Sequence, residues 1–249
     1  MKNYRYDGSF DGFLSTVFEA YKFRSGIASV SSEPRQIALD QDGSFIQTDL
    51  AKARRVEKYI RNEISDQFFR DVQACFLSSS EDKDTAAIKT IYKAIEVGPR
   101  VMDMMDDDVM KMRKYVKQVL GERHRYLGLV RFREMKDGTL LSTIEPKNDI
   151  LTIIIPHFRE RLRNERFAIF DKKRGMLAYY DTKDTEIFFT EAVNAEWSDD
   201  ELVFAELWKL FHRTISIREK VDRKLQKGNL PKYYWKHLVE EMEDLEMGS

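Results

Sequence analysis

Apolar side chains recur every three or four residues along much of the chain, which is the spacing of helices with one buried face. The first helix is predicted to start after Ser9, its N-cap, and to end near Tyr21. A second helical region covers about 49–79 and is expected to break near Ser65. Its buried positions are predicted to be Val56, Ile60, Ile64, Phe68, Val72, Cys75 and Phe76.

Shorter elements surround these helices. Runs flanked by Gly and Pro predict strands at 27–30 and 44–48. Helical spacing returns across 88–95, where Gly98 and the proline after it end the helix, and again across 109–120. The N-terminal part is therefore predicted to be mainly helical.

The polar run SSSEDKDT at 78–85 has no periodicity, which is typical of a connecting segment. It predicts a boundary between a mainly helical N-terminal domain, 1–81, and a C-terminal domain, 82–249.

Short apolar runs separated by turn residues dominate the chain after about residue 126. Strands are predicted at 127–133, 139–144, 150–155, 167–170, 176–180 and 186–189. The first two form a hairpin around Asp137-Gly138, and Pro156 is expected to begin a short helix. Two further helices should begin at Ser198 and Pro231. Because we find no alternation typical of βαβ units, the pattern predicts an α+β fold with a mostly antiparallel sheet bracketed by helices.

Composition narrows the class of protein. With 249 residues, 42% hydrophobic and 34% charged, the chain is long enough for one large domain or two small ones, and a disordered tail protein is excluded. Its longest apolar runs are far shorter than a bilayer requires, so we expect no membrane partner. The single cysteine, Cys75, excludes an internal disulfide and is interpreted as a small buried hydrophobe. A cytoplasmic location is the expectation.

Charge is balanced in total but segregated along the chain. Lys and Arg number 42 and Asp and Glu 43, so net charge alone indicates no anionic partner. Basic blocks nevertheless occur at 111–134, 159–174 and 209–236, separated by acidic segments. If these blocks met on one face, they would form a phosphate-binding surface. The alternative is that they are ordinary solvated faces that pair with the acidic segments.

Two of these blocks contain candidate nucleic-acid contacts. In the second block, His157 is predicted near the start of a short helix, where an anion could bind, close to Arg159, Arg161 and Arg163. In the third block the candidates are His212, Arg213, Ser216, Lys232, Tyr233 and Lys236. Their alternative role is structural, because His and Arg also stabilise the end of a helix and the nearby Trp235 has the spacing of a core residue.

Motifs for catalysis are weak or missing. The four histidines show no metal-binding spacing, and no Gly-rich phosphate loop or nucleophile elbow occurs. Glu134 and Lys136 have the ExK spacing of metal-dependent nucleases, although solvated hairpin residues are the simpler interpretation. We therefore expect no metal and no cofactor, name no catalytic residue, and consider a non-catalytic role more consistent with the sequence.

Three segments resemble a bacterial family described as probable DNA metabolism or putative DNA repair proteins. They are YDGSFDGFLSTVFEAY near the N-terminus, IIIPHF with Arg161 and FAIFD in the middle, and FHRTISIREK with LPKYYWKHL near the C-terminus. The resemblance covers almost the whole chain. Glu219 and Asp222 reduce the positive charge of a segment that is more basic in the family.

The resemblance implies a companion role. Members are typically encoded beside a putative radical-SAM protein thought to act on DNA, and the part matching about 82–249 occurs fused to uracil-DNA-glycosylase-like domains. Our first hypothesis is therefore a DNA-binding accessory protein that assists such an enzyme. The alternatives are a protein-interaction adaptor without DNA contact, and an unrecognised DNA-processing enzyme in which folding brings His157, His212 and Glu134 together.

Overall fold

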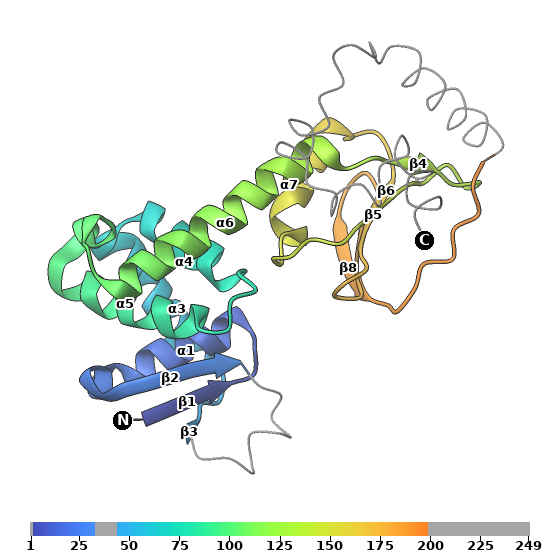
Figure 1. The fold of residues 1–249 in the computed structure, drawn as a ribbon. Helices are drawn as coiled ribbons and strands as arrows, with labels where there is room; N and C mark the ends of the chain where they lie inside the picture. The colour runs from blue at the N-terminus through green and yellow to red at the C-terminus, as the bar shows by residue number, and fades with distance from the viewer. Residues whose placement is uncertain (1, 33–43, 199–249) are drawn as a thin grey trace, which may run out of the picture. The chain divides into compact units, whose positions relative to one another are not determined.

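The computed structural model describes residues 2–32 and 44–198, shown as coloured ribbon in Figure 1. The chain divides into two compact units, Met1–Gly121 and Glu122–Ser249. Its fold class is α+β, as the pattern predicted, because helices dominate the first part and a mostly antiparallel sheet forms in the second. The helices predicted from Ser198 and from Pro231 lie outside the described residues.

The first unit combines a small parallel sheet with helices. The strands are β1 (Lys2–Tyr6), β2 (Ile27–Ser32) and β3 (Ser44–Phe45), in the order β2-β1-β3. The helices are α1 (Phe10–Ala20), α3 (Leu50–Tyr59), α4 (Asp66–Phe76), α5 (Lys83–Val97) and the part of α6 (Asp107–Leu129) up to Gly121, with 3-10 turns η1 (Tyr21–Gly26) and η3 (Gly98–Asp103) and a π-helix η2 (Ile60–Ile64). Helices α1, α3, α4 and α5 lie on one side of this sheet in Figure 1.

Local signals placed several of these elements correctly. The Ser9 hydroxyl accepts a hydrogen bond from Gly12 N at 2.9 Å and caps α1. Ser65 interrupts the second helical region in an extended conformation and caps α4 through Phe68 N at 3.0 Å. Gly98, at φ +74°, ends α5. Cys75 is buried, as predicted.

The polar run at 78–85 is part of the first unit and not a linker between units. Helix α5 begins inside it and packs against α4 and β2. Asp84 is only 2% exposed and accepts hydrogen bonds from the Tyr6 hydroxyl at 2.9 Å and from Lys83 Nζ at 2.7 Å. The compact units divide at 121/122, whereas the sequence suggested a division after residue 81.

The second unit is built on a five-stranded sheet. Its elements are β4 (Arg133–Glu134), β5 (Leu140–Ile144), α7 (Leu151–Arg161), β6 (Phe167–Asp171), β7 (Met176–Tyr180) and β8 (Thr185–Phe189). The order is β4-β5-β6-β7-β8, and only β5 and β6 are parallel. The three strands predicted after residue 166 are confirmed.

Two predicted strands are wrong. Helix α6 continues to Leu129, so only Arg133 of the predicted strand 127–133 pairs with β5, together with Glu134 just beyond it. Residues 151–155, predicted as a strand, form the first half of α7, and Pro156 lies inside this helix. A short apolar run fits a buried helix as well as a buried strand, and here the helix connects two parallel strands.

The absence of βαβ units was also a wrong prediction. Helix α1 connects the parallel strands β1 and β2 along the chain, and α7 connects the parallel strands β5 and β6. Each of these segments is a βαβ unit. Among the described residues, no helix combines the length and apolar character that crossing a membrane requires.

Candidate nucleic-acid interface

The prediction that His157 lies near the start of a short helix is wrong. Because α7 starts at Leu151, His157 lies in its second half, where the free N–H groups of a helix start are missing. The His157 side chain is half-buried, and its ring meets Phe158 edge-on with centroids 5.1 Å apart. Arg159 and Arg161 occupy the last turn, where cations stabilise the helix dipole.

The arginines at the end of α7 differ in how they are held. Arg159 donates a hydrogen bond to the Lys183 carbonyl at 3.0 Å, and its guanidinium lies 5.2 Å from the centre of the Tyr180 ring. Arg159 therefore connects α7 to the turn between β7 and β8. Arg161 and Arg163 are exposed, and neither forms an ion pair in the part of the chain that the structure describes. These two side chains are available to a ligand.

The second basic block does not form a single surface. Arg163 lies before the start of β6, whereas Lys172 to Arg174 lie in the turn after its end, about 13 Å along a five-residue strand. Arg174 donates to Asp171 Oδ2 at 2.9 Å and to the Lys147 carbonyl at 2.8 Å. Burial raises the pKa of Asp171, while Arg174 acts in the opposite direction. Arg174 therefore has a structural role in this turn.

Helix α6 presents a basic surface, as α3 does with the exposed Arg54, Arg55 and Lys58. Arg113, Lys114 and Lys117 are exposed on α6 and lie within an arc of about 100° at 3.6 residues per turn. No acidic residue occurs between Asp108 and Glu122 in the sequence. None of the three cations forms an ion pair within the ranges that the structure describes. We call these three residues the α6 basic face.

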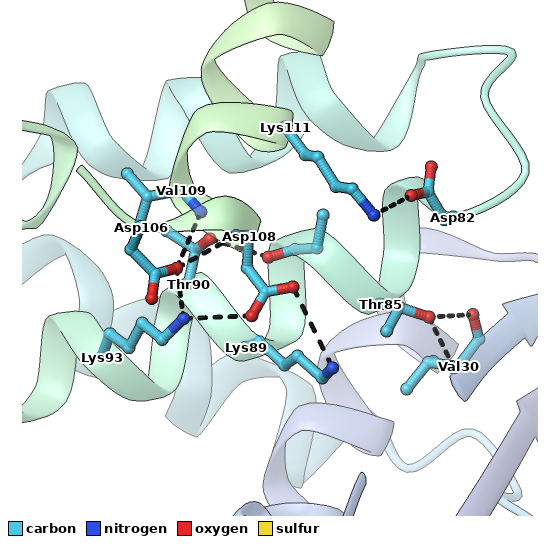
Figure 2. A network of polar contacts seen from close by, with 11 residues as sticks. Val30, Asp82, Thr85, Lys89, Thr90, Lys93, Asp106, Asp108, Val109 and Lys111 are labelled. Atoms are coloured by element: carbon cyan, nitrogen blue, oxygen red, sulfur yellow. Dashed lines mark hydrogen bonds and ion pairs between the residues drawn. The ribbon is translucent and has the colours of Figure 1, made fainter. Parts of the chain in front are cut away.

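Two carboxylates at the start of α6, Asp106 and Asp108, form ion pairs with a lysine of α5 (Figure 2). Asp106 and Asp108 both bind Lys93, with the Lys93 Nζ to Asp108 Oδ2 distance at 3.0 Å, and Asp106 also caps the helix through Val109 N. The side-chain hydrogen bond from Lys93 is the main cause of the lowered pKa of Asp106. Lys111 Nζ lies 2.8 Å from Asp82 Oδ2. None of these ion pairs involves Arg113, Lys114 or Lys117.

Sequence reasoning identified this block but selected no residue of the α6 basic face as a site residue. The signal that could have found it is the alternation of Arg113, Lys114 and Lys117 with the buried Met112 and Val116. That pattern separates an exposed cationic face from a buried apolar one on a single helix.

The third predicted group lies outside the described residues. It consists of His212, Arg213, Ser216, Lys232, Tyr233 and Lys236.

The ExK pair is an ordinary surface feature. Glu134 lies on the short strand β4, and Lys136 Nζ forms an ion pair with Glu196 Oε2 at 3.2 Å, both side chains being largely exposed. Within 2–32 and 44–198, no group of three His, Cys, Asp or Glu side chains is arranged to hold a metal ion.

Comparison with known proteins gives a family and no function. The fold is of the α+β class, and one of its helices, α6, carries the α6 basic face. The chain belongs to the family described as DUF4130, a domain of unknown function, which matches residues 81–240. No curated protein and no solved structure matches the chain.

Proposed function

We propose that this protein binds nucleic acid through the sugar-phosphate backbone and acts as a non-catalytic accessory protein in DNA metabolism. One observation supports the proposal most directly: three exposed cations, Arg113, Lys114 and Lys117, share a helix face without a described carboxylate partner. Such a face attracts phosphates without reading base sequence. Arg161 and Arg163, at the end of α7, provide a second pair of available cations.

The enzyme that it assists belongs, in this proposal, to the radical-SAM or uracil-DNA-glycosylase-like class. The resemblance to probable DNA metabolism proteins supports this choice. A backbone-binding companion would increase the time that such an enzyme spends on DNA, and it needs no cofactor of its own.

The test is neutralisation of the α6 basic face in the full-length chain. Replacing Arg113, Lys114 and Lys117 together with Gln should weaken binding to short DNA at low salt by about tenfold or more. The dependence of log K on log salt concentration should become shallower by about two to three units if all three contact phosphate. Fluorescence anisotropy with single-stranded, duplex and uracil-containing DNA measures both quantities.

A matched control removes the same charge elsewhere. Arg70, Arg100 and Lys183 are exposed on three separate elements and share no helix face, and their joint replacement with Gln should leave the salt dependence nearly unchanged. Replacing Arg161 and Arg163 with Gln tests the α7 pair separately. Equal loss in the α6 variant and the control would show that only net charge matters, and the interface assignment would then be wrong.

A protein-interaction adaptor is the second candidate function. Strand β8 pairs only with β7 among the described strands and leaves Ile187, Phe188 and Phe189 exposed, the last at 81%. Exposed apolar side chains on a sheet edge are typical of a protein contact. A complex with the neighbouring radical-SAM protein that survives high salt, with no DNA binding by this chain, would favour the adaptor.

A further inference from the structure

The first unit contains an apolar cavity of about 420 Å³ between α1, α3 and α5. Its inner wall is aliphatic and consists of the buried side chains Val17, Val56, Ile60 and Ile91. Phe18 and Tyr59 contribute aromatic surface, and Tyr59 is 43% exposed. Ligand-binding pockets have volumes of roughly 300–1,000 Å³ and are lined mainly by such side chains. The cavity therefore has the size and lining of a small-molecule site.

The charged side chains around the cavity favour an anion. Lys22 and Arg55 both line it, and neither forms an ion pair with a described residue. The Arg55 guanidinium lies 5.5 Å from the centre of the Phe18 ring, at the aromatic side of the cavity. Glu19 is the only carboxylate in the lining, and Lys52 Nζ binds it at 2.7 Å. A ligand with one negative group would therefore meet two cations that no described carboxylate neutralises.

The backbone of the cavity wall is unusual at the same place. The wall residue Ile60 is the first residue of the π-helix η2, and its carbonyl accepts a hydrogen bond from Ser65 N at 2.9 Å, five residues later. A π-helix is rare and occurs frequently at functional sites. This observation is independent of the charges and points to the same cavity.

We propose that the cavity binds a small apolar monoanion of the medium-chain carboxylate class, with the hydrocarbon chain against the aliphatic wall and the carboxylate at Arg55. The ligand gains free energy from burial of its chain and from a charge-assisted hydrogen bond. None of the cavity residues belongs to the α6 basic face, so the proposal stands apart from DNA binding.

The experiment compares the binding of decanoate and decanol to the full-length protein by calorimetric titration. Decanol has the same hydrocarbon chain and no charge. Decanoate is used below the concentration at which it forms micelles. Decanoate should bind with one-to-one saturation and more tightly than decanol. Arg55→Gln should weaken decanoate binding by about tenfold and leave decanol binding unchanged, since a charge-assisted hydrogen bond contributes about 1.4 kcal/mol or more. Arg54→Gln, an exposed neighbour that does not line the cavity, is the matched control and should bind as the unmodified protein does.

A second variant tests the location. Ile95→Trp fills the cavity from a half-buried position and should abolish binding of both compounds, with circular dichroism confirming that each variant is folded. Equal affinity for decanoate and decanol would overturn the anion assignment. Binding that survives in Ile95→Trp would overturn the site. If neither compound binds, the small-molecule assignment is wrong. The remaining occupant would then be an apolar side chain of a protein partner.

Discussion

Asp84 shows how much a single side chain can depend on a distant partner. Its carboxylate is buried and accepts hydrogen bonds from Tyr6 and Lys83. Burial and the neighbouring Asp84 both raise the pKa of Tyr6, so this hydroxyl stays protonated and remains a donor. This arrangement could not be predicted from the sequence, because Tyr6 lies 78 positions away and Asp84 is part of a polar run.

Asp84→Ala should lower the free energy of unfolding by about 3 kcal/mol, because it leaves the Tyr6 hydroxyl and the Lys83 ammonium without their buried acceptor. Urea unfolding followed by far-UV circular dichroism measures the change. Asp103→Ala, at an exposed position, is the control and should change the value by less than about 0.5 kcal/mol. A loss equally small for Asp84→Ala would mean that the buried hydrogen bonds contribute little.

At the scale of elements, helix starts and breaks were predicted correctly where they depend on residues that are close together in the sequence. Ser9 and Ser65 start helices through hydrogen bonds to N–H groups three residues later, and both were readable from the sequence. Helix α7 was misread because its start depends on residues elsewhere. Buried Glu122 accepts hydrogen bonds from the backbone N–H groups of Lys147 and Asn148, both at 2.8 Å, and thereby fixes the loop that precedes α7.

The candidate site, like the fold, could be predicted from the sequence only in part. The sequence located the basic blocks but could not assign their faces, which depend on where α6 and α7 begin and end. Arg159 was predicted as a nucleic-acid contact, yet it is engaged by the Lys183 carbonyl. Arg161 and Arg163 are exposed, and their contact with DNA stays a prediction.

Ser65→Ala should lower the free energy of unfolding by about 1 kcal/mol, because Phe68 N loses the hydroxyl acceptor that caps α4. Ser65→Asp keeps an acceptor at the cap and should restore most of the stability. Thermal and urea unfolding of both variants check the prediction. If the Ala and Asp variants proved equally stable, the cap would not be the source of the effect.

At the scale of the whole molecule, stability should depend on pH through its ion pairs. Lys93 and Lys111 are the main causes of the lowered pKa values of Asp106 and Asp82, respectively. A carboxyl whose pKa is lower in the folded chain stabilises it above the unfolded pKa of about 3.8, and this stabilisation is lost as the pH falls below that value. Burial raises the pKa of Asp71 and Asp171, which act in the opposite direction.

Asp106→Asn isolates one of these contributions. The unmodified protein should lose its stability advantage over this variant as the pH falls below about 3.8 and through the lower pKa of Asp106 in the folded chain, because protonation of Asp106 breaks its ion pair with Lys93. Urea unfolding at several pH values measures the difference. A difference that is constant across this range would show that the charge on Asp106 is not responsible.

Helix α5 belongs both to the first compact unit and to the segment that matches the family. Its residues Ile88 and Ile91 are fully buried, and Thr85 bonds the backbone of Val30 on β2 (Figure 2). A gene fusion that kept residues 81–240 and replaced everything before them would strip this helix of β2 and of the Tyr6 hydroxyl. The newly joined domain would then have to supply a matching apolar surface and a hydrogen-bond donor for Asp84. A fusion of residues 81–240 to another domain should therefore fold stably only where these contacts of α5 are replaced.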